Sequence, residues 1–185
     1  MARTSSAAPS RRPPPPGGGS TPPAARPPKR FAAKVHTETV NVAKSDLPAA
    51  ISRADLVLVD TEHGGHSFET RVFLNNTAAN ADTPLTPDSG YAGTFHVFGH
   101  GGCFGDAGHC EVNDRGKSPT DLRGLHPLTP MRKEITVTDA LNRVLQSGDL
   151  KTVTLVPLAI GRPVGGDPAN EDVLRYGSLK LLTYA

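Results

Sequence analysis

The stretch that decides the fold runs from Asp55 to Leu74 and reads DLVLVDTEHGGHSFETRVFL. It opens with a compact apolar run, 55–60, and closes with 68–74, where apolar and polar side chains alternate towards Asn75. Short runs rich in Val, Leu and Phe with this alternation are typical of β-strands. The Gly64-Gly65 pair between the two runs is typical of a turn, so the stretch predicts a β-hairpin.

Further strands are predicted on both sides of this stretch. One precedes it at 35–43, which is rich in Thr and Val, and others follow at 91–98, 134–137, 151–157 and 174–184. A long polar stretch with several prolines, 76–90, separates the predicted strand at 91–98 from the predicted hairpin. About seven short strands with turn signals between them predict a mainly β domain, an antiparallel β-sandwich or a barrel-like fold.

One short helix is also predicted. Thr138 is a candidate N-cap, three apolar residues follow on one helical face, and Gly148 can end the helix. The three apolar residues are Leu141, Val144 and Leu145. This pattern indicates a packing helix that covers part of the β core.

The first thirty residues differ in composition from the rest of the chain. Half of the 18 prolines and a Gly17–Ser20 run lie there, with six basic residues and no acidic one, whereas the remainder has 14 basic and 18 acidic residues. We therefore expect a disordered Pro/Gly/Arg-rich tail or linker at 1–30 and one β-sandwich domain at 31–185. Six scattered charges without aromatic residues do not predict nucleic-acid binding. The sequence shows neither a secretory apolar core nor a run of roughly 20 apolar residues, so we expect a cytoplasmic protein without a membrane span.

The segment His96–Cys110 concentrates donors that suit copper or zinc. We predict a metal site formed by His100, Cys103, His109 and Cys110. His96 is a weaker candidate, because on a regular strand it would lie roughly 13 Å from His100 unless the intervening glycines bend the chain. The spacing of the cysteines matches no zinc template. A Cys103–Cys110 disulfide, two reduced cysteines under a Gly-rich loop and solvated histidines all remain open, so no cofactor is assigned with certainty and copper is the candidate.

Catalytic motifs are absent from the sequence. It contains no nucleophile elbow, phosphate-binding loop, dinucleotide fingerprint or zinc-protease helix. A cysteine–histidine nucleophile pair would lack the third residue that orients it. His63 and His66 flank the predicted turn, where a conformational role is expected, and His36 and His126 receive no role. We therefore predict no catalytic residue, and we expect that the chain alone is not an enzyme.

The order of the predicted strands resembles that of the C-terminal β-domain of tyrosinases and polyphenol oxidases, over roughly Phe31 to Ala185. The segments that carry this resemblance are Leu56-Val-Leu-Val-Asp60, Arg71-Val-Phe-Leu-Asn75, Tyr91-Ala-Gly-Thr-Phe-His-Val-Phe-Gly-His100, Ile135-Thr-Val-Thr-Asp-Ala-Leu141 and Val153-Thr-Leu-Val-Pro157. In that family, six histidines of a separate helical domain hold two coppers, and the β-domain covers the mouth of the active site. This chain lacks the helical domain, so no dicopper ligand is carried over.

The resemblance implies an accessory role. We expect the chain to dock on a tyrosinase-like copper oxidase, as a separate chain or a fused domain, and to limit access to its active site. Tyr91, Phe98 and Phe104 are the predicted docking residues. The alternative is a copper-binding or copper-delivery protein that uses the His/Cys-rich segment 96–110.

Overall fold

The computed structural model describes residues 28–99, 129–161 and 171–185. Within these ranges the chain forms eight strands, one α-helix and two short 3-10 helices, and none of the helices has the length and apolar character of a membrane span. The strands are β1 (Arg30–Ala32), β2 (His36–Val42), β3 (Arg53–Thr61), β4 (Phe68–Leu74), β5 (Tyr91–Val97), β6 (Met131–Thr136), β7 (Leu150–Ile160) and β8 (Ser178–Tyr184). The helices are η1 (Lys44–Asp46), η2 (Pro87–Ser89) and α1 (Thr138–Ser147). The prediction of a mainly β fold with one short α-helix is confirmed.

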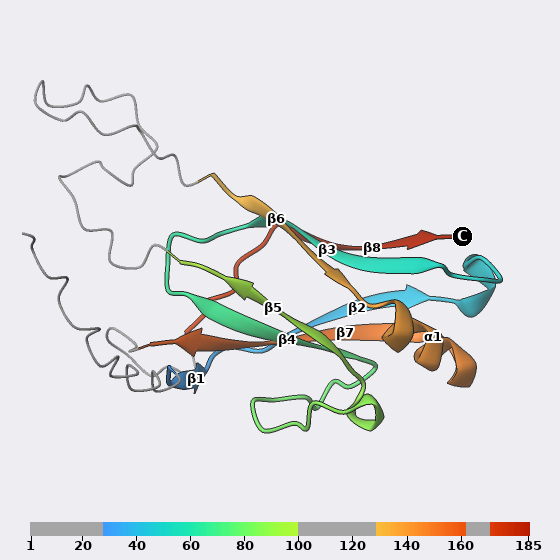
Figure 1. Cartoon of the computed structure of the whole chain (residues 1–185), viewed down its shortest axis with the longest axis horizontal. Coiled ribbons are helices and arrows are strands. Elements are labelled where there is room, and N and C mark those ends of the chain that lie inside the picture. Colours follow the sequence, from blue (N-terminus) through green and yellow to red (C-terminus); the bar gives the residue numbers. More distant parts are fainter. Residues whose placement is uncertain (1–27, 100–128, 162–170) are drawn as a thin grey trace, which may run out of the picture.

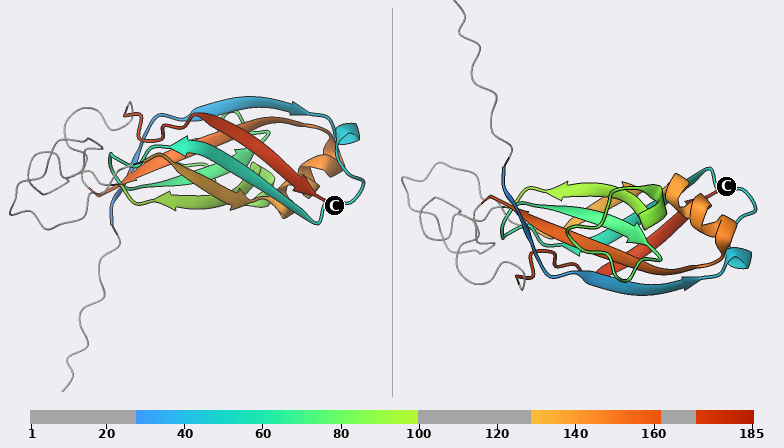
Figure 2. Two further views of the ribbon diagram at one scale, coloured as in Figure 1. Left: turned by 90° about the horizontal axis from the view of Figure 1, so that it is seen from above. Right: turned by 90° about the horizontal axis from the view of Figure 1, so that it is seen from below.

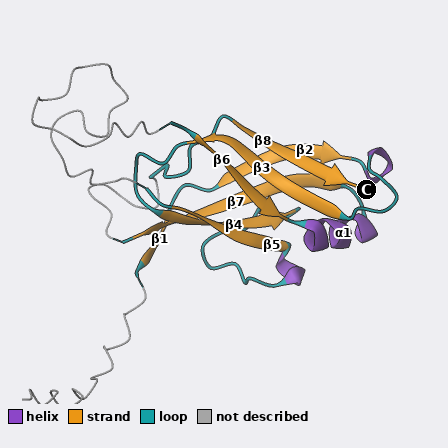
Figure 3. Cartoon of the chain, turned by 45° about the horizontal axis from the view of Figure 1, so that its top comes forward, coloured by secondary structure: helices purple, strands orange, loops and turns teal. Residues whose placement is uncertain are grey.

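The strands form two antiparallel sheets that face each other, as Figure 1 and Figure 3 show. One sheet has the order β1-β7-β4-β5, with β2 also paired to β7, and the other has the order β6-β3-β8. On one side of the sandwich β5 contacts β6, which brings the two sheets together. On the other side β2 and β8 are the edge strands, and the sheets do not close into a barrel.

The core lies between the two sheets because the strands alternate their side chains. Leu56 and Leu58 of β3 face Phe68 and Val72 of β4, and all four are essentially inaccessible to solvent. At about 25 cal/mol per Å² of apolar surface removed from water, each such side chain contributes on the order of 2 kcal/mol. All four residues belong to the stretch 55–74, so this stretch supplies the centre of both sheets.

The predicted β-hairpin is wrong. β3 pairs with β6 and β8, whereas β4 pairs with β5 and β7, so the turn at residues 62–67 carries the chain from one sheet to the other. The glycines do mark a turn, but both apolar runs bury a face against the opposite sheet. Pairing of adjacent strands would place those faces side by side in one sheet, where they could not cover each other.

β7 extends beyond its predicted end at Pro157. It continues to Ile160, and Pro157 lies where the neighbouring strand changes: β2 pairs with β7 up to Leu155, and β1 pairs with it from Leu158. A proline has no N–H for a ladder hydrogen bond, so this gap between two partners is a position that tolerates it. Its carbonyl still accepts a bond from the Ala33 amide, 3.2 Å away.

α1 begins and ends near its predicted bounds, but Thr138 is not its cap. The residue before the helix is Val137, which provides no side-chain cap, and the Thr138 hydroxyl accepts a hydrogen bond from the Ala54 amide of β3 at 2.9 Å. Thr138 therefore fastens the helix to the three-stranded sheet. Gly148 ends the helix as predicted, with φ 155° and a backbone amide that donates a hydrogen bond to the Val144 carbonyl.

Asn75 joins the end of β4 to the start of β7. Its backbone is left-handed, with φ 54°, and its side chain makes three hydrogen bonds. Nδ2 donates to the Asp149 carbonyl at 2.8 Å, and Oδ1 accepts from the amides of Lys151 and Thr152 at 2.7 and 3.1 Å. Asparagine tolerates a left-handed conformation better than most residues, so both the backbone and the side chain favour it here.

Candidate functional site

Most of the predicted metal site lies outside the described residues. His100, Cys103, Phe104, His109 and Cys110 fall within 100–128, so the metal prediction and one of the three docking residues stay predictions. Within the ranges that the structure describes, no group of three or more His, Cys, Asp and Glu side chains is arranged to hold a metal ion.

His96, the weaker metal candidate, lies on β5 directly opposite Glu69 of β4. Its Nε2 is 3.5 Å from the Glu69 carboxylate, and half of the side chain is exposed. This imidazole therefore lies beside a carboxylate that two arginines, Arg30 and Arg71, also contact.

The predicted docking residues Tyr91 and Phe98 lie at opposite ends of β5. Tyr91 packs its ring against Phe73, with centroids 5.7 Å apart, and its hydroxyl bonds to Thr94. Phe98 has no such packing, because 83% of its surface is exposed. Of the two, only Phe98 has the exposure that an apolar docking residue needs.

We call the part of the sandwich around Phe98 the Phe98 end, and define it as residues 29–30, 62–67, 98–99, 129–131, 160–161 and 171–172. Backbone and side-chain hydrogen bonds join these segments. The Ile160 amide donates to the Ser67 carbonyl, the Gly161 amide donates to that of Lys29, and His63 Nε2 lies 2.9 Å from the Thr129 carbonyl. These segments therefore lie together at one end of the sandwich, as Figure 1 and Figure 2 show.

Gly99 fixes the backbone on which Phe98 stands. Its amide donates to the Ser67 hydroxyl at 3.0 Å. A Cβ at this position would lie 2.2 Å from the Gly65 carbonyl oxygen and 2.3 Å from the His66 carbonyl carbon, so only glycine permits the approach. On the other side of Phe98, Val97 is buried in the core. Phe98 is thus held outward by two anchored neighbours.

A buried carboxylate with two arginine partners lies beside this end. Glu69 is 4% exposed, and its two oxygens accept bonds from Arg30 at 2.6 Å and Arg71 at 3.0 Å. Burial raises the pKa of Glu69, but the hydrogen bonds and charges of the two arginines outweigh it and hold the pKa below its ordinary value of 4.5. The cluster ties β1, β4 and β5 together on the outward face of the larger sheet.

A second polar cluster lies at the open side of the sandwich. His36 Nε2 bonds to Asp172 at 2.9 Å, and Lys34 bonds to the same carboxylate at 3.0 Å. Burial raises the pKa of Asp172, but these two partners more than offset that effect and lower it. Beside them the Tyr176 hydroxyl donates to Glu38 at 2.5 Å. Burial, and next this hydrogen bond, raise the pKa of Tyr176, so the phenol keeps its proton.

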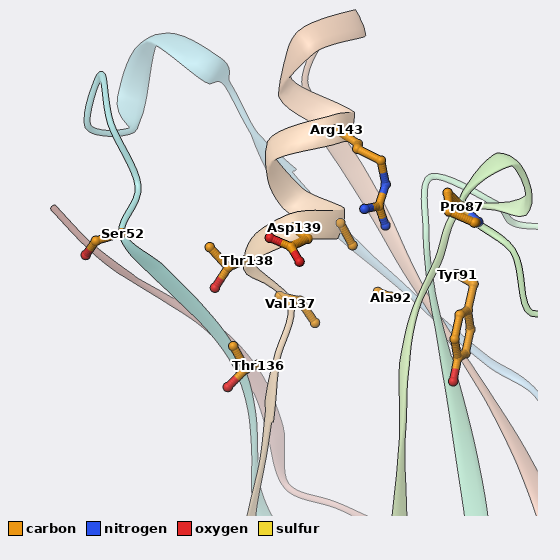
Figure 4. A pocket seen from close by; sticks show the side chains of 10 residues that line it. Ser52, Pro87, Tyr91, Ala92, Thr136, Val137, Thr138, Asp139 and Arg143 are labelled. Atoms are coloured by element: carbon orange, nitrogen blue, oxygen red, sulfur yellow. The ribbon is translucent and has the colours of Figure 1, made fainter.

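Apart from these two clusters, a hollow lies between α1 and the start of β5 (Figure 4). It has a volume of about 520 Å³, and Thr136, Asp139 and Arg143 are among the residues that line it. Figure 4 shows the Arg143 side chain reaching from the helix towards Pro87. Both Arg143 and Asp139 are exposed at the surface, and none of the residues that line the hollow has a buried polar side-chain atom without a hydrogen-bond partner. Its geometry supports no specific chemistry.

Sequence reasoning missed the residues that shape these clusters. Glu69 appeared as one polar position of an alternating strand, and His36 received no role, although it pairs with Asp172, 136 residues later in the chain. A polar residue at an inward position of a strand, such as Glu38 two residues before the inward-facing Val40, was the one signal available in the sequence.

Among known proteins, the chain is similar to solved structures and to no family model or curated protein. No protein-family model matches the sequence, and no curated protein matches it. Among solved structures, the chain is similar to "latent aurone synthase (polyphenol oxidase) from natural source", with TM-score 0.42, 13% identity, and coverage of 80% of this chain and 24% of that one. It is also similar to recombinantly expressed latent aurone synthase, a polyphenol oxidase, with TM-score 0.42, 15% identity, and coverage of 88% and 26%. The chain spans about a quarter of the length of these two proteins. The resemblance is thus a weak one, to part of a polyphenol oxidase.

Proposed function

We propose that this chain is a non-catalytic accessory domain that docks on a tyrosinase-like copper oxidase through the Phe98 end and limits access to the oxidase active site. The observation that carries the proposal is Phe98 itself. It is a large apolar side chain, 83% exposed, on a backbone fixed by a buried neighbour and by the packing of Gly99. Exposed aromatic residues on rigid backbone are typical anchors of protein interfaces, because little conformational entropy is lost when they bind.

The sequence resemblance supplies the kind of partner. The strand segments that resemble the β-domain of copper oxidases include β5, and Phe98 follows its last residue. The surroundings of Phe98 also suit a contact surface. Arg30 and Glu171, which pair with Glu69 and His66, belong to the same end of the sandwich, and charged groups beside an apolar centre are the usual arrangement of an interface.

The proposal is tested with the full chain and a type 3 copper oxidase that lacks its own β-domain. We expect the chain to bind the oxidase and to slow its oxidation of a diphenol. Phe98→Ala is expected to weaken binding about 30-fold, the effect of losing an anchor worth about 2 kcal/mol. Leu85→Ala, which removes an exposed apolar side chain from the segment between β4 and β5, is the matched control and should leave binding unchanged.

Absence of binding, or binding with no change in oxidase rate, would contradict the proposal. Equal loss of binding in the Phe98 and Leu85 variants would show that a different surface makes the contact. Both variants change exposed side chains, so neither should alter the fold, and a circular dichroism spectrum checks this.

A further inference from the structure

The cavity at the open side of the sandwich is lined by a half-buried carboxylate, Glu38, for which the described residues provide no cationic partner. β2 alternates its side chains, so Glu38 faces the same way as Val40 and Val42, which pack against the core. A charge at such a position is costly unless a charge of opposite sign compensates it. Within the described ranges, the Tyr176 hydroxyl is the group that donates a hydrogen bond to it.

Glu38 differs from the other buried or half-buried carboxylates of the described ranges in having no basic side chain nearby. Among the described residues, the Asp and Glu side chains that are buried or half-buried number five, and the other four all have a basic side chain within 4 Å. Those four pairs are Asp55 with Arg53, Glu69 with Arg30, Glu171 with His66, and Asp172 with His36. Within the same part of the chain, no ion pair reaches Glu38.

The surroundings of Glu38 form a site rather than a flat surface. A cavity of about 540 Å³ opens beside it, lined mainly by polar groups that include His36, Asp172, Tyr176 and Ser178. The rings of His36 and Tyr176 lie 5.8 Å apart and tilted by 60°, so the carboxylate has aromatic neighbours. Arg175 also lines the cavity, but it is two-thirds exposed and its guanidinium lies 3.7 Å from Glu62, on the chain that enters the Phe98 end.

The hydrogen bonds already made within the cavity determine which kind of ligand it can bind. Nε2 of His36 is engaged by Asp172, and one oxygen of Glu38 is engaged by the Tyr176 phenol. The second oxygen of Glu38 and Nδ1 of His36 remain, and both can accept hydrogen bonds when the imidazole is neutral. An acceptor-rich site with a negative charge and an aromatic ring suits a cation that donates hydrogen bonds, because the ring face adds attraction for the charge.

From these observations we infer that the cavity beside Glu38 binds an alkylammonium group, which pairs with the Glu38 carboxylate against the Tyr176 ring. The group can belong to a small free amine or to a lysine side chain of another protein. The site lies at the β2 edge, and its occupancy does not depend on docking through Phe98.

The experiment is a titration of the ¹⁵N-labelled full chain at a fixed pH of 8, followed by amide chemical shifts. The probes are n-butylammonium, n-butanol as its neutral counterpart, and the blocked peptide acetyl-Gly-Lys-Gly-amide. We expect saturable shifts around residues 36–38 and 176–178 with n-butylammonium and none with n-butanol. Tighter binding of the peptide would assign the site to a lysine side chain, and tighter binding of n-butylammonium would assign it to a free amine.

Variants separate the charge of Glu38 from the hydroxyl of Tyr176. Glu38→Gln keeps an acceptor for Tyr176 but removes the charge, and it should weaken n-butylammonium binding about tenfold or more. Glu134→Gln, the same change at an exposed carboxylate of β6, is the matched control and should leave binding unchanged within about twofold. Tyr176→Phe keeps the ring and should retain binding.

Three outcomes would overturn the inference. They are the absence of saturable binding by both cationic probes, equal binding of n-butanol, and full retention of binding in Glu38→Gln. The comparison of n-butylammonium with n-butanol uses the unaltered chain, so it decides the question even if a variant fails to fold.

Discussion

Replacing Asn75 by alanine tests how β4 is joined to β7. The change removes three side-chain hydrogen bonds, to Asp149, Lys151 and Thr152, and leaves alanine in a left-handed conformation. Each bond contributes about 1 kcal/mol net, and because the residue is exposed, water replaces part of this, so we take about 2 kcal/mol for the three. The left-handed backbone adds about 1 kcal/mol for alanine. We therefore expect the free energy of unfolding to fall by about 3 kcal/mol.

The assay is urea denaturation followed by circular dichroism, with a shift of the midpoint at constant slope. Asn75→Gly separates the two contributions, because glycine adopts the left-handed conformation freely and loses only the hydrogen bonds. It should cost about 2 kcal/mol. Thr77→Ala, an exposed neighbour, is the control and should change stability by less than about 0.5 kcal/mol.

A loss of less than about 1 kcal/mol in Asn75→Ala would refute the reasoning, since it would mean that water fully replaces the three bonds. Equal losses in the alanine and glycine variants would refute the part that concerns the backbone.

The hydrogen bond from Asn75 Nδ2 to the Asp149 carbonyl also bears on glycosylation. Asn75-Asn76-Thr77 has the form of a glycosylation sequon, but the nitrogen that a glycan would occupy is already engaged in the folded chain.

Two further predictions concern Gly99 at the Phe98 end and Glu69 beside it. Gly99→Ala should destabilise the chain by about 1–3 kcal/mol, because the added methyl meets backbone atoms of Gly65 and His66. The control is Gly65→Ala, whose methyl meets nothing within 4 Å and should be nearly neutral. Thermal unfolding of both variants measures the difference, and equal melting temperatures would contradict the close packing of Gly99. The lowered pKa of Glu69 makes its contribution to stability fully present above its ordinary value of 4.5 and lost as the pH falls through the lower folded value. Urea denaturation between pH 6 and pH 3 should therefore show a decline that is shallower in Glu69→Gln, and parallel declines in the two proteins would exclude this linkage.

The sequence predicted strands best where one face of the strand is buried. β4 has its predicted bounds, Phe68–Leu74, because Phe68, Val72 and Leu74 of its inward face are buried in the core and a one-residue shift would expose them. β8 begins four residues later than predicted. Leu174 is fully buried, so its apolar signal was real, but it packs against the core without joining a ladder. Apolar periodicity reports burial, and it does not distinguish a paired strand from an extended segment that is merely packed.

The connection between the two sheets was beyond what local sequence could predict. A glycine pair between two strands has the same appearance whether the chain returns within one sheet or crosses to the other. The choice depends on which faces bury each other, and that involves β6, β7 and β8 from the far end of the chain. The same limit applies to the two polar clusters, since Glu38 and Tyr176 are 138 residues apart and only the completed fold brings them together.

The position of the Phe98 end has a consequence for how this domain can diversify. The Gly99 and Gly161 amides are held there by the Ser67 hydroxyl and the Lys29 carbonyl. These hydrogen bonds and the sheet registers fix the backbone of the Phe98 end, whichever side chains that end exposes. Substitutions at exposed positions such as Phe98 can therefore change what this end recognises while the core and the strand pairing stay the same.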